Sequence, residues 1–573
     1  MTMNADRPFR WERSYPPGVR WDAPIGVTTL PALSDRATSQ HADRIAFEFN
    51  DCQLSYRQFG ELERKAAAGF LKLGIGKGAP LALYLPNSPF HPIALFGASR
   101  CGAKIVNLST LDAEREIIQK LNDSGARTLV TTDHRGLLVT ANKLLAAGYL
   151  DLVIVCEENL FGPSPALLEP FDETARCLSF KHLIESVQIP NRWPQINAAD
   201  IALLQYTGGT TGTPKAAMLT HANLTAAASI YDAWFAPQRG PDAGPERVIC
   251  VLPLSHIFGM SAVMLRHLKN GNEMLLRQRF DVETTLHDIE VKRATALPGV
   301  PTMWIALLQH PDIRSRDLSS LRFCSSGGAP LPPEVARRFT EITGVPVRGG
   351  YGMTESSPAG TNLPLAGELP AGTIGLPLPG ITIEVVALDD PRRVLGPNET
   401  GEFRIKGPNV TQGYWNRPEE SALAFVDGWF LTGDIGTMDD NGFFFLIDRK
   451  KQMIISSGFK IYPAVVEAAI YEHSDVEEAV VIGIPDDYRG EAAKAFVKLR
   501  PGAPPLTLEL LRGFLRDKIG RQEMPVALEL RNALPRTAVG KLSREALIRA
   551  ECVISKASHR DQSQPDQSII LPS

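Results

Sequence analysis

Residues 206–215 read Tyr-Thr-Gly-Gly-Thr-Thr-Gly-Thr-Pro-Lys, and they follow the apolar run Ile-Ala-Leu-Leu-Gln at 201–205. The run predicts a buried strand, and the glycines let the backbone after it turn sharply and approach a ligand. Successive backbone N–H groups in such a turn bind anions, and Lys215 adds a positive charge suited to phosphate. The stretch therefore predicts a polyphosphate-binding loop at the end of a strand.

The loop is not a Walker loop, because that motif needs glycine, lysine and a hydroxyl residue in direct succession. Here Pro214 precedes the lysine and Ala216 follows it. The alternative interpretation is an ordinary Gly/Thr turn at the surface, so the rest of the chain has to decide between the two.

The segments before this loop alternate between strand and helix patterns. Helical patterns cover 56–73, 90–100 and 112–122, and strand patterns cover 81–85, 103–108, 128–132 and 152–156. Such alternation predicts parallel sheets, in which ligands bind at the carboxyl ends of the strands. The proline-rich residues 157–200 predict an irregular surface segment.

Two more glycine-rich segments follow predicted strands. One is Ser325–Pro330, and the other is Gly349–Glu355. In the second, the planar ring of Tyr351 can stack on a base, Thr354 can donate to a phosphate, and Glu355 offers the kind of oxygen that Mg²⁺ prefers. A turn with an exposed glutamate is the alternative, but three such strand ends favour a nucleotide site.

After about Ile374 the sequence pattern changes to short strands separated by Gly and Pro turns, which predicts a small β-subdomain. Within it, Asp434 is expected at a strand end, where it could accept the hydroxyls of a ribose. We expect a large domain over 1–447, a compact α+β domain over 448–551 and a disordered tail over 552–573.

Two single residues have open interpretations at this point. His256 follows a predicted strand, and a lone histidine there is more often structural than catalytic. Lys541 lies in a glycine-flanked loop, where it is either a solubility charge or a mobile catalytic cation.

The bulk composition limits the classes of function. The chain has 573 residues, a net charge of −4 and seven cysteines, none with zinc-ligand or CxxC spacing. It has no basic field for nucleic acid, no secretory signal and no run of ~20 apolar residues. We expect a cytoplasmic protein that binds no nucleic acid; peripheral membrane contact and a homodimer stay open.

Taken in order, the motifs resemble the adenylate-forming superfamily of acyl-CoA synthetases, luciferases and peptide-synthetase adenylation domains. The resemblance runs from about residue 30 to 550 and is greatest to bacterial long-chain fatty-acid–CoA ligases, on residues 204–212, 448–451, 457–459 and 462–463. It implies an α/β fold: a large N-terminal domain of two α/β sheets plus a small β-subdomain, and a mobile small α+β C-terminal domain.

The resemblance also implies a role for each matching position. The implied catalytic residues are Lys541, His256, Thr354 and Glu355, and the implied metal ligands are Glu355 and Thr211. The phosphate loop would consist of Thr207, Gly208, Gly209, Thr210, Thr211, Gly212 and Lys215. The adenine slot would be lined by Gly328, Ala329, Pro330, Gly350, Tyr351, Gly352 and Met353. The ribose would be held by Asp434 and Arg449, the hinge would be Lys451, and the pantetheine path would pass Ser457, Gly458 and Phe459.

The implied reaction uses ATP, Mg²⁺ and coenzyme A. A carboxylate attacks the α-phosphorus of ATP to give acyl-AMP and pyrophosphate, and a thiol then displaces AMP. The resemblance implies that a rotation at Lys451 exchanges Lys541 for the Gly458 loop between these two steps, as in other hinge closures.

Four positions depart from the family pattern: Ala216, Ser255, Met260 and Lys460. Ser255 and Met260 leave the acyl preference open, so a ligase for an aryl or other apolar acid is an alternative to a medium- or long-chain fatty-acid ligase. An acyl-AMP ligase that serves a carrier protein is a further alternative. A nucleotide-binding regulator without turnover is disfavoured, because a sensor needs no adenylation lysine.

Overall fold

We describe the protein from a computed structural model, which covers residues 7–207, 214–240, 244–457, 459–486, 488–536 and 542–551. The chain forms two compact units. The first consists of Met1–Glu399, Phe403–Thr432 and Met438–Phe445, and the second of Thr400–Glu402, Gly433–Thr437 and Leu446–Ser573. The expected domain limits at 447 and 551 stay predictions, and the expected tail over 552–573 lies outside the described residues.

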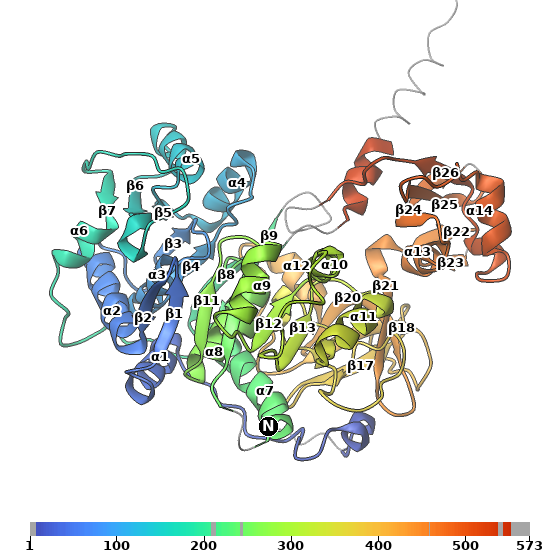
Figure 1. Cartoon of the computed structure of the whole chain (residues 1–573), viewed down its shortest axis with the longest axis horizontal. Coiled ribbons are helices and arrows are strands. Elements are labelled where there is room, and N and C mark those ends of the chain that lie inside the picture. Colours follow the sequence, from blue (N-terminus) through green and yellow to red (C-terminus); the bar gives the residue numbers. More distant parts are fainter. Residues whose placement is uncertain are drawn as a thin grey trace, which may run out of the picture. The chain divides into compact units, whose positions relative to one another are not determined.

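The first unit contains two seven-stranded sheets, as predicted (Figure 1). One has the strand order β7-β6-β5-β3-β4-β8-β9, and its neighbours are parallel except for the antiparallel pair β8–β9. Its strands are β3 (Pro80–Leu83), β4 (Lys104–Asn107), β5 (Thr128–Thr132), β6 (Leu152–Cys156), β7 (Cys177–Ser179), β8 (Ile201–Thr207) and β9 (Lys215–Thr220). The intervening helices are α2 (Tyr56–Lys72), α3 (Phe90–Cys101), α4 (Glu114–Ser124), α5 (Arg135–Ala146) and α6 (Phe180–Glu185).

The other large sheet has the order β14-β13-β12-β10-β11-β1-β2, and in it only β1 and β2 pair antiparallel. Its strands are β1 (Ile45–Phe49), β2 (Cys52–Ser55), β10 (Arg247–Cys250), β11 (Glu273–Leu276), β12 (Ala296–Gly299), β13 (Phe323–Ser326) and β14 (Val347–Gly349). The helices of this part are α1 (Leu30–Gln40), α7 (His221–Arg239), the π-helix η3 (Phe258–Leu265), α8 (Arg266–Lys269), α9 (Val282–Glu290), α10 (Pro301–Gln309) and α11 (Pro333–Thr343).

The strands of these sheets are rich in apolar residues because both faces of each sheet are covered. Leu129, Val153 and Leu204, on three strands of the first sheet, are all buried in one core cluster. A parallel strand covered by helices on both faces needs apolar residues at consecutive positions. The carboxyl end of β8 is therefore a fixed platform for the residues that follow it.

A smaller sheet follows in the chain, with the order β17-β18-β20-β19 and with β21 paired to β20. Its strands are β17 (Thr382–Val386), β18 (Gly401–Lys406), β19 (Phe425–Val426), β20 (Trp429–Met438) and β21 (Phe444–Arg449), and α12 (Pro418–Ala424) precedes β19. The expectation that Asp434 ends a strand was wrong, because this residue lies inside the ten-residue β20.

The C-terminal part of the second unit is a five-stranded sheet, β23-β22-β25-β24 with β26 beside β25. It contains β22 (Ile454–Ser456), β23 (Phe459–Ile461), β24 (Val476–Asp486), β25 (Gly490–Leu499) and β26 (Ala527–Leu530), with the helices α13 (Pro463–Tyr471), α14 (Leu508–Leu515) and 544–551. Val466, Leu511 and Leu515 bury the helices against this sheet.

One expectation about the chain's connecting segments needs correction. Residues 157–200 are not wholly irregular, since β7 joins the first sheet and α6 follows it. Near the N-terminus, the short helix η1 (Arg10–Ser14) buries Trp11. Trp21 further along donates its indole N–H to the Ile381 carbonyl over 2.7 Å.

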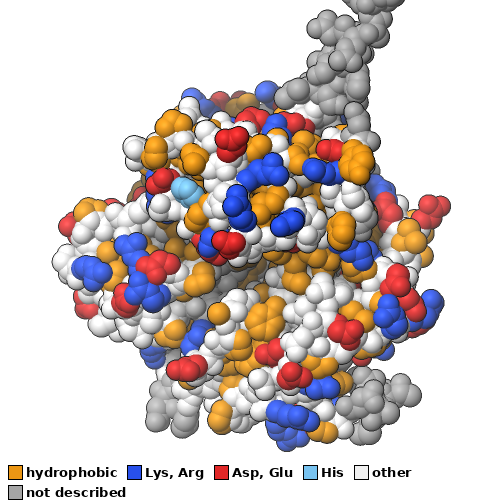
Figure 2. Space-filling model, turned by 90° about the vertical axis from the view of Figure 1, so that its right-hand side faces the viewer, with side chains coloured by type: hydrophobic (Ala, Val, Ile, Leu, Met, Phe, Trp, Pro, Cys, Tyr) orange, Lys and Arg blue, Asp and Glu red, His pale blue; other side chains and the backbone are white. Residues whose placement is uncertain are grey.

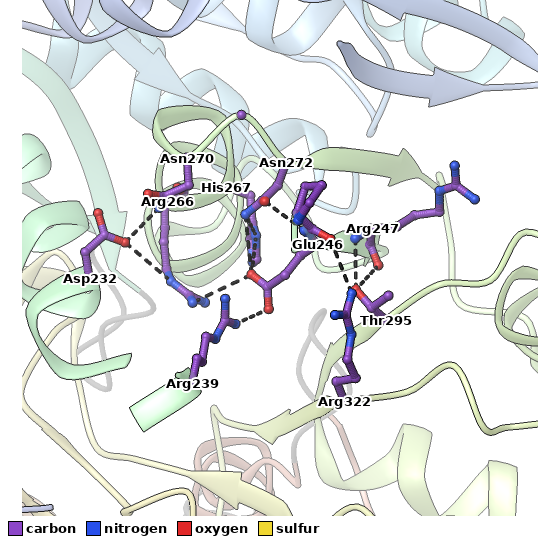
Figure 3. A network of polar contacts seen from close by, with 12 residues as sticks. Asp232, Arg239, Glu246, Arg247, Arg266, His267, Asn270, Asn272, Thr295 and Arg322 are labelled. Atoms are coloured by element: carbon purple, nitrogen blue, oxygen red, sulfur yellow. Dashed lines mark hydrogen bonds and ion pairs between the residues drawn. The ribbon is translucent and has the colours of Figure 1, made fainter. Parts of the chain in front are cut away.

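A buried network of charges ties α7 and α8 to the start of β10 (Figure 3). Glu246 is only 6% exposed and forms an ion pair with Arg239. Its Oε2 lies 3.2 Å from His267 Nδ1 and 3.8 Å from Arg266 Nη2. Burial raises the pKa of Glu246, but His267, Arg266 and Arg239 outweigh this and hold the pKa well below its usual range.

The surface carries both signs of charge. On the face shown in Figure 2, Lys and Arg side chains are interspersed with Asp and Glu and with single hydrophobic side chains. This mixture agrees with the low net charge of −4. Among the described residues, none of the helices combines the length and the apolar character needed to cross a membrane.

Candidate active site

The strand pair β8–β9 brings the two ends of the predicted phosphate loop together. Thr207 and Lys215 are register partners in this pair, and the Thr207 hydroxyl donates to the Lys215 carbonyl over 3.4 Å. The sequence between them includes Gly208, Gly209, Thr210, Thr211 and Gly212, which lie outside the described residues. Lys215 is thus fixed at the first position of an edge strand, next to the end of β8.

A tyrosine that the sequence analysis did not select joins Lys215 to the proposed metal ligand. The Tyr414 hydroxyl donates to Glu355 Oε1 over 2.7 Å. The Lys215 ammonium lies 5.7 Å from the centre of the Tyr414 ring, within cation–π range. Burial first, and then the negative charge of Glu355, raise the pKa of Tyr414, so this hydroxyl stays a donor.

Backbone pairing holds this tyrosine in place. Residues 413–415 run beside β9: the Met218 N–H donates to the Gly413 carbonyl over 2.9 Å, and the Trp415 N–H donates to the Ala216 carbonyl over 2.8 Å. The Thr411 N–H donates to the Glu355 carbonyl over 2.7 Å. Both ends of the Tyr414–Glu355 hydrogen bond are therefore attached to the same strand edge.

The two other glycine-rich segments leave neighbouring strands of the second large sheet. Ser326 at the end of β13 pairs with Gly349 at the end of β14. Gly328, with φ +80°, Ala329 and Pro330 follow the first strand and are exposed. The predicted adenine-lining segments thus start side by side at carboxyl strand ends, where α/β sheets bind ligands.

Close backbone approach explains two glycines in the second segment. A Cβ at Gly352 would lie 1.5 Å from the Pro358 carbonyl oxygen, and one at Gly350 would lie 2.2 Å from the Thr361 carbonyl oxygen. Tyr351 between them is half-buried, and its ring meets the edge of Phe403 with the centroids 6.0 Å apart.

Thr354 and Glu355 begin the short 3₁₀ helix η4 (Thr354–Ser356), which follows Met353. Glu355 is only 7% exposed, and Thr354 is half-buried. The helix is held from outside by Asn409, whose amide donates to the Ser356 carbonyl over 2.5 Å and to the Ala359 carbonyl over 2.8 Å. This support and the hydrogen bond from Tyr414 hold Glu355 in place.

His256 lies in the turn between β10 and η3. An N–H of Phe258 donates to His256 Nδ1 over 3.3 Å, so this nitrogen is an acceptor. The buried Asn87 holds the preceding strand end: its amide donates to the Leu252 carbonyl over 2.9 Å, and its Oδ1 accepts from the Leu254 N–H over 2.8 Å. Gln205 of β8 adds a bond from Nε2 to the Ser255 carbonyl, 3.0 Å.

The π-helix after His256 contacts two of the glycine-rich segments. The Phe258 ring lies so close to Gly327 that a Cβ there would be 2.7 Å from Phe258 Cε1. Ser261 donates to the Ser357 carbonyl over 2.6 Å, which attaches the helix to the turn after Glu355. Single π-turns are frequent at functional sites.

The second unit holds the proposed ribose ligands. Asp434 is 4% exposed, and its Oδ1 lies 3.3 Å from Arg449 Nε, so the structure brings this predicted pair together. Lys450 donates to Glu402 over 2.7 Å. Lys451, in the short helix η5 (Lys450–Gln452), is exposed.

Two of the proposed pantetheine residues, Ser457 and Phe459, lie after β22 and at the start of β23. Ser457 adopts a left-handed conformation, φ +49°, and its N–H donates to the Arg489 carbonyl over 2.8 Å. Phe459 is 58% exposed. Gly458 and Lys541 lie outside the described residues, so their predicted roles have no geometry here.

Magnesium can be accommodated by this arrangement. Mg²⁺ in phosphate sites takes one or two carboxylates together with substrate oxygens and water. Glu355 supplies one such carboxylate, with an oxygen held by Tyr414. No cluster of three or more His, Cys, Asp or Glu side chains suited to a metal occurs within the part of the chain that the structure describes. The donor set therefore fits an ion held jointly with a phosphate.

Comparison with known proteins shows the family of the chain. The model for the AMP-binding enzyme family matches residues 34–415, and the model for the AMP-binding enzyme C-terminal domain matches residues 465–541. The chain therefore belongs to the family of AMP-binding enzymes.

Individual relatives cover nearly the whole chain. The long-chain-fatty-acid–CoA ligase of Bacillus subtilis is 37% identical over 96% of this chain and 99% of its own length. A feruloyl-CoA synthase of Amycolatopsis is 36% identical over 90% of this chain and 97% of its own. The crystal structure of ATP-bound MatB from Rhodopseudomonas palustris superimposes with a TM-score of 0.81 at 26% identity, covering 92% of this chain and 100% of that one.

Proposed function

We propose that this chain is an AMP-forming acyl-CoA synthetase that activates a medium- or long-chain fatty acid with ATP and transfers the acyl group to coenzyme A. The observation that carries the proposal is the contact set of Lys215, Tyr414 and Glu355. It joins a phosphate-binding cation to a metal-binding carboxylate from two motifs that are far apart in sequence. A nucleotide polyphosphate is the ligand that needs both.

The proposed chemistry follows from the charges involved. The fatty-acid carboxylate attacks the α-phosphorus of ATP, the bond to the β-phosphate oxygen breaks, and acyl-AMP and pyrophosphate result. Negative charge builds up on the phosphoryl oxygens during this step. Lys215 stabilises the departing pyrophosphate, Thr354 donates to the α-phosphate, and Lys541 supplies a second cation. Mg²⁺ at Glu355 neutralises phosphate charge when it is bound.

The second step is thiol transfer. The thiol of coenzyme A attacks the acyl carbonyl of acyl-AMP, and AMP leaves with the mixed-anhydride oxygen. We assign the ribose of the nucleotide to Asp434 and Arg449, which already lie 3.3 Å apart. The pantetheine arm is assigned to Ser457, Gly458 and Phe459. The hinge that switches the enzyme between the adenylation form and the thiol-transfer form is assigned to Lys451.

An aryl acid is the second candidate substrate. The feruloyl-CoA synthase that is 36% identical to this chain favours it. The close contact between Phe258 and Gly327 would form the wall of the acid pocket that distinguishes alkyl from aryl acids. Seven long-chain-fatty-acid–CoA ligases at 33–37% identity support the alkyl acid as the first candidate.

The test is a panel of carboxylic acids assayed for pyrophosphate release and for CoA-thioester formation. Palmitate, octanoate, ferulate and benzoate would each be offered with ATP, Mg²⁺ and coenzyme A. We expect both products, with the fatty acids preferred. Pyrophosphate without thioester would contradict coenzyme A as acceptor and favour an acyl-AMP ligase. No product with any acid would favour the nucleotide-binding regulator.

The role of Lys541 is tested by separating the two half-reactions. We expect Lys541→Ala to lose pyrophosphate release from ATP but to keep thioester formation from supplied acyl-AMP. Equal loss of both half-reactions would contradict the assigned role. A cytoplasmic location, peripheral membrane contact and a homodimer remain predictions, which fractionation, vesicle sedimentation and ultracentrifugation would examine.

A further inference from the structure

Lys215 has an acidic partner that neither the sequence motifs nor the proposed chemistry requires. Its ammonium forms an ion pair with the carboxylate of Glu420 in α12. The Lys215 side chain is 23% exposed and that of Glu420 is 36% exposed, so the pair is partly withdrawn from water. A phosphate would need the same ammonium.

A chain of alternating charges holds Glu420 in this position. Its Oε1 lies 3.7 Å from Arg417 Nε. Arg417 Nη1 lies 3.2 Å from Asp123 Oδ1, and the Tyr206 hydroxyl donates to Asp123 Oδ2 over 2.8 Å. A cavity of about 380 Å³ is lined by Arg417, Asp123 and Tyr206. The relay thus anchors Glu420 to the end of β8, which leads into the phosphate loop.

The helix that carries Glu420 is also fixed locally. The Ser421 hydroxyl accepts from the Tyr414 N–H over 2.9 Å, and the Ser421 N–H donates to the Arg417 carbonyl over 2.9 Å. The bond from Tyr414 to Ser421 keeps the Tyr414 ring close to Glu420. Lys215 can therefore stay in contact with the ring while its ammonium moves between the Glu420 carboxylate and a bound phosphate. A lysine, with its flexible stem and rotatable donors, can make such an exchange.

We propose that Glu420 is a built-in competitor for the phosphates of ATP at Lys215. The carboxylate holds the ammonium while no nucleotide is bound, and the polyphosphate displaces it on binding. When pyrophosphate leaves, Glu420 takes the lysine back, which favours release. Glu420 is therefore a positioning residue that limits affinity for ATP and pyrophosphate. The inference rests on the proposed function, since it takes a polyphosphate as the ligand of Lys215.

The size of the effect follows from the exposure of the pair. A partly exposed ion pair contributes up to about 1 kcal/mol, so its removal should change polyphosphate affinity about two- to fivefold. The alternative is that the ion pair has a purely structural role and only stabilises the fold. In that case removing it would lower thermal stability without tightening polyphosphate binding.

The test compares Glu420→Gln with Glu419→Gln in the full-length protein. Glu419 is the neighbouring glutamate of the same helix and is exposed, so it matches the charge change without the contact. Calorimetric binding of inorganic pyrophosphate with Mg²⁺ gives Kd without any turnover. We expect Kd to fall about two- to fivefold in Glu420→Gln and to stay unchanged in Glu419→Gln. An unchanged or higher Kd in Glu420→Gln would overturn the proposal.

A double-variant cycle separates exchange at Lys215 from general repulsion. In a Lys215→Gln background, Glu420→Gln should no longer tighten pyrophosphate binding, because the shared ammonium is gone. If the tightening persists there, Glu420 acts only as a nearby negative charge and the proposal is wrong. These titrations do not depend on the acid panel, so a failure of the proposed ligase activity can be told apart from a failure of this inference.

Discussion

Tyr414 Oη and Glu355 Oε1 are 2.7 Å apart, and this hydrogen bond joins a loop beside β9 to the 3₁₀ helix that carries the proposed metal ligand. The tyrosine orients one carboxylate oxygen of Glu355. A buried carboxylate without such a donor would lose both its orientation and part of its stabilisation.

Tyr414→Phe should therefore weaken magnesium-dependent adenylation while leaving the fold intact. The phenyl ring keeps the contact with Lys215, so only the bond to Glu355 is lost. Hydrogen bonds to charged groups contribute about 1.5–3 kcal/mol, which predicts a loss of at least about tenfold in kcat/KM for ATP. Pyrophosphate release measured over a Mg²⁺ titration checks this, with a shift to higher Mg²⁺ expected. An unchanged Mg²⁺ dependence would contradict the positioning role.

Gly327→Ala should change the choice of acid. A Cβ at this position would meet Phe258 Cε1 at 2.7 Å, so the ring must shift and reshape the wall proposed for the acid. We expect kcat/KM for palmitate to fall about tenfold or more relative to octanoate, since one methylene in a pocket is worth about 10–200-fold. The double variant Gly327→Ala, Phe258→Ala should recover the long acid. Equal losses for both acids, with no recovery, would place the pocket elsewhere.

Glu246→Ala should destabilise the first unit strongly. The variant leaves Arg266, whose side chain is 4% exposed, near an empty position in the network of Figure 3. Breaking a buried pair by removing one partner costs about 3–5 kcal/mol. Asp151→Ala is the matched control, because its pair with Arg127 is exposed, and it should cost less than about 1 kcal/mol. Urea unfolding followed by tryptophan fluorescence measures both. Similar losses would mean that the network contributes no more than a surface pair.

His91 should make the protein less stable in mild acid. Its ring is buried, and this burial lowers its pKa to about 4. The unfolded chain, with a pKa near 6.5, therefore binds more protons between these values, so stability is full above pH 6.5 and falls as the pH drops towards 4. Against His91→Phe, the wild type should lose about 2 kcal/mol between pH 7.5 and pH 5.0. Parallel pH curves in urea unfolding would contradict this.

The sheets could be predicted because their signal is local. Residues 128–132, Thr-Leu-Val-Thr-Thr, are mostly β-branched, and residues 152–156 are a continuous apolar run; the structure has β5 and β6 at these positions. The strand β9 was missed, since Lys-Ala-Ala-Met-Leu-Thr has little β-branched character and forms a strand through its partner β8.

The supports of the site could not be predicted in the same way. Asn87 contacts the Leu252 carbonyl 165 positions away, and Tyr414 contacts Glu355 across 59 positions. No periodicity or spacing encodes such contacts, because they arise only when separate strands are assembled into a sheet. The aromatic pair Tyr414-Trp415 beside a glycine was the one available signal, and it has many other interpretations.

The contact between Phe258 and Gly327 has an evolutionary consequence. The two positions lie 69 residues apart in the chain, yet a side chain gained at one requires space given up at the other. Changes of acid preference in descendants of this sequence would therefore accumulate in a fixed order, with the ring reduced before the glycine is replaced. A mutational path taken in the reverse order would pass through a poorly active intermediate. This epistasis would make it difficult for a sequence to change from one acid preference to the other.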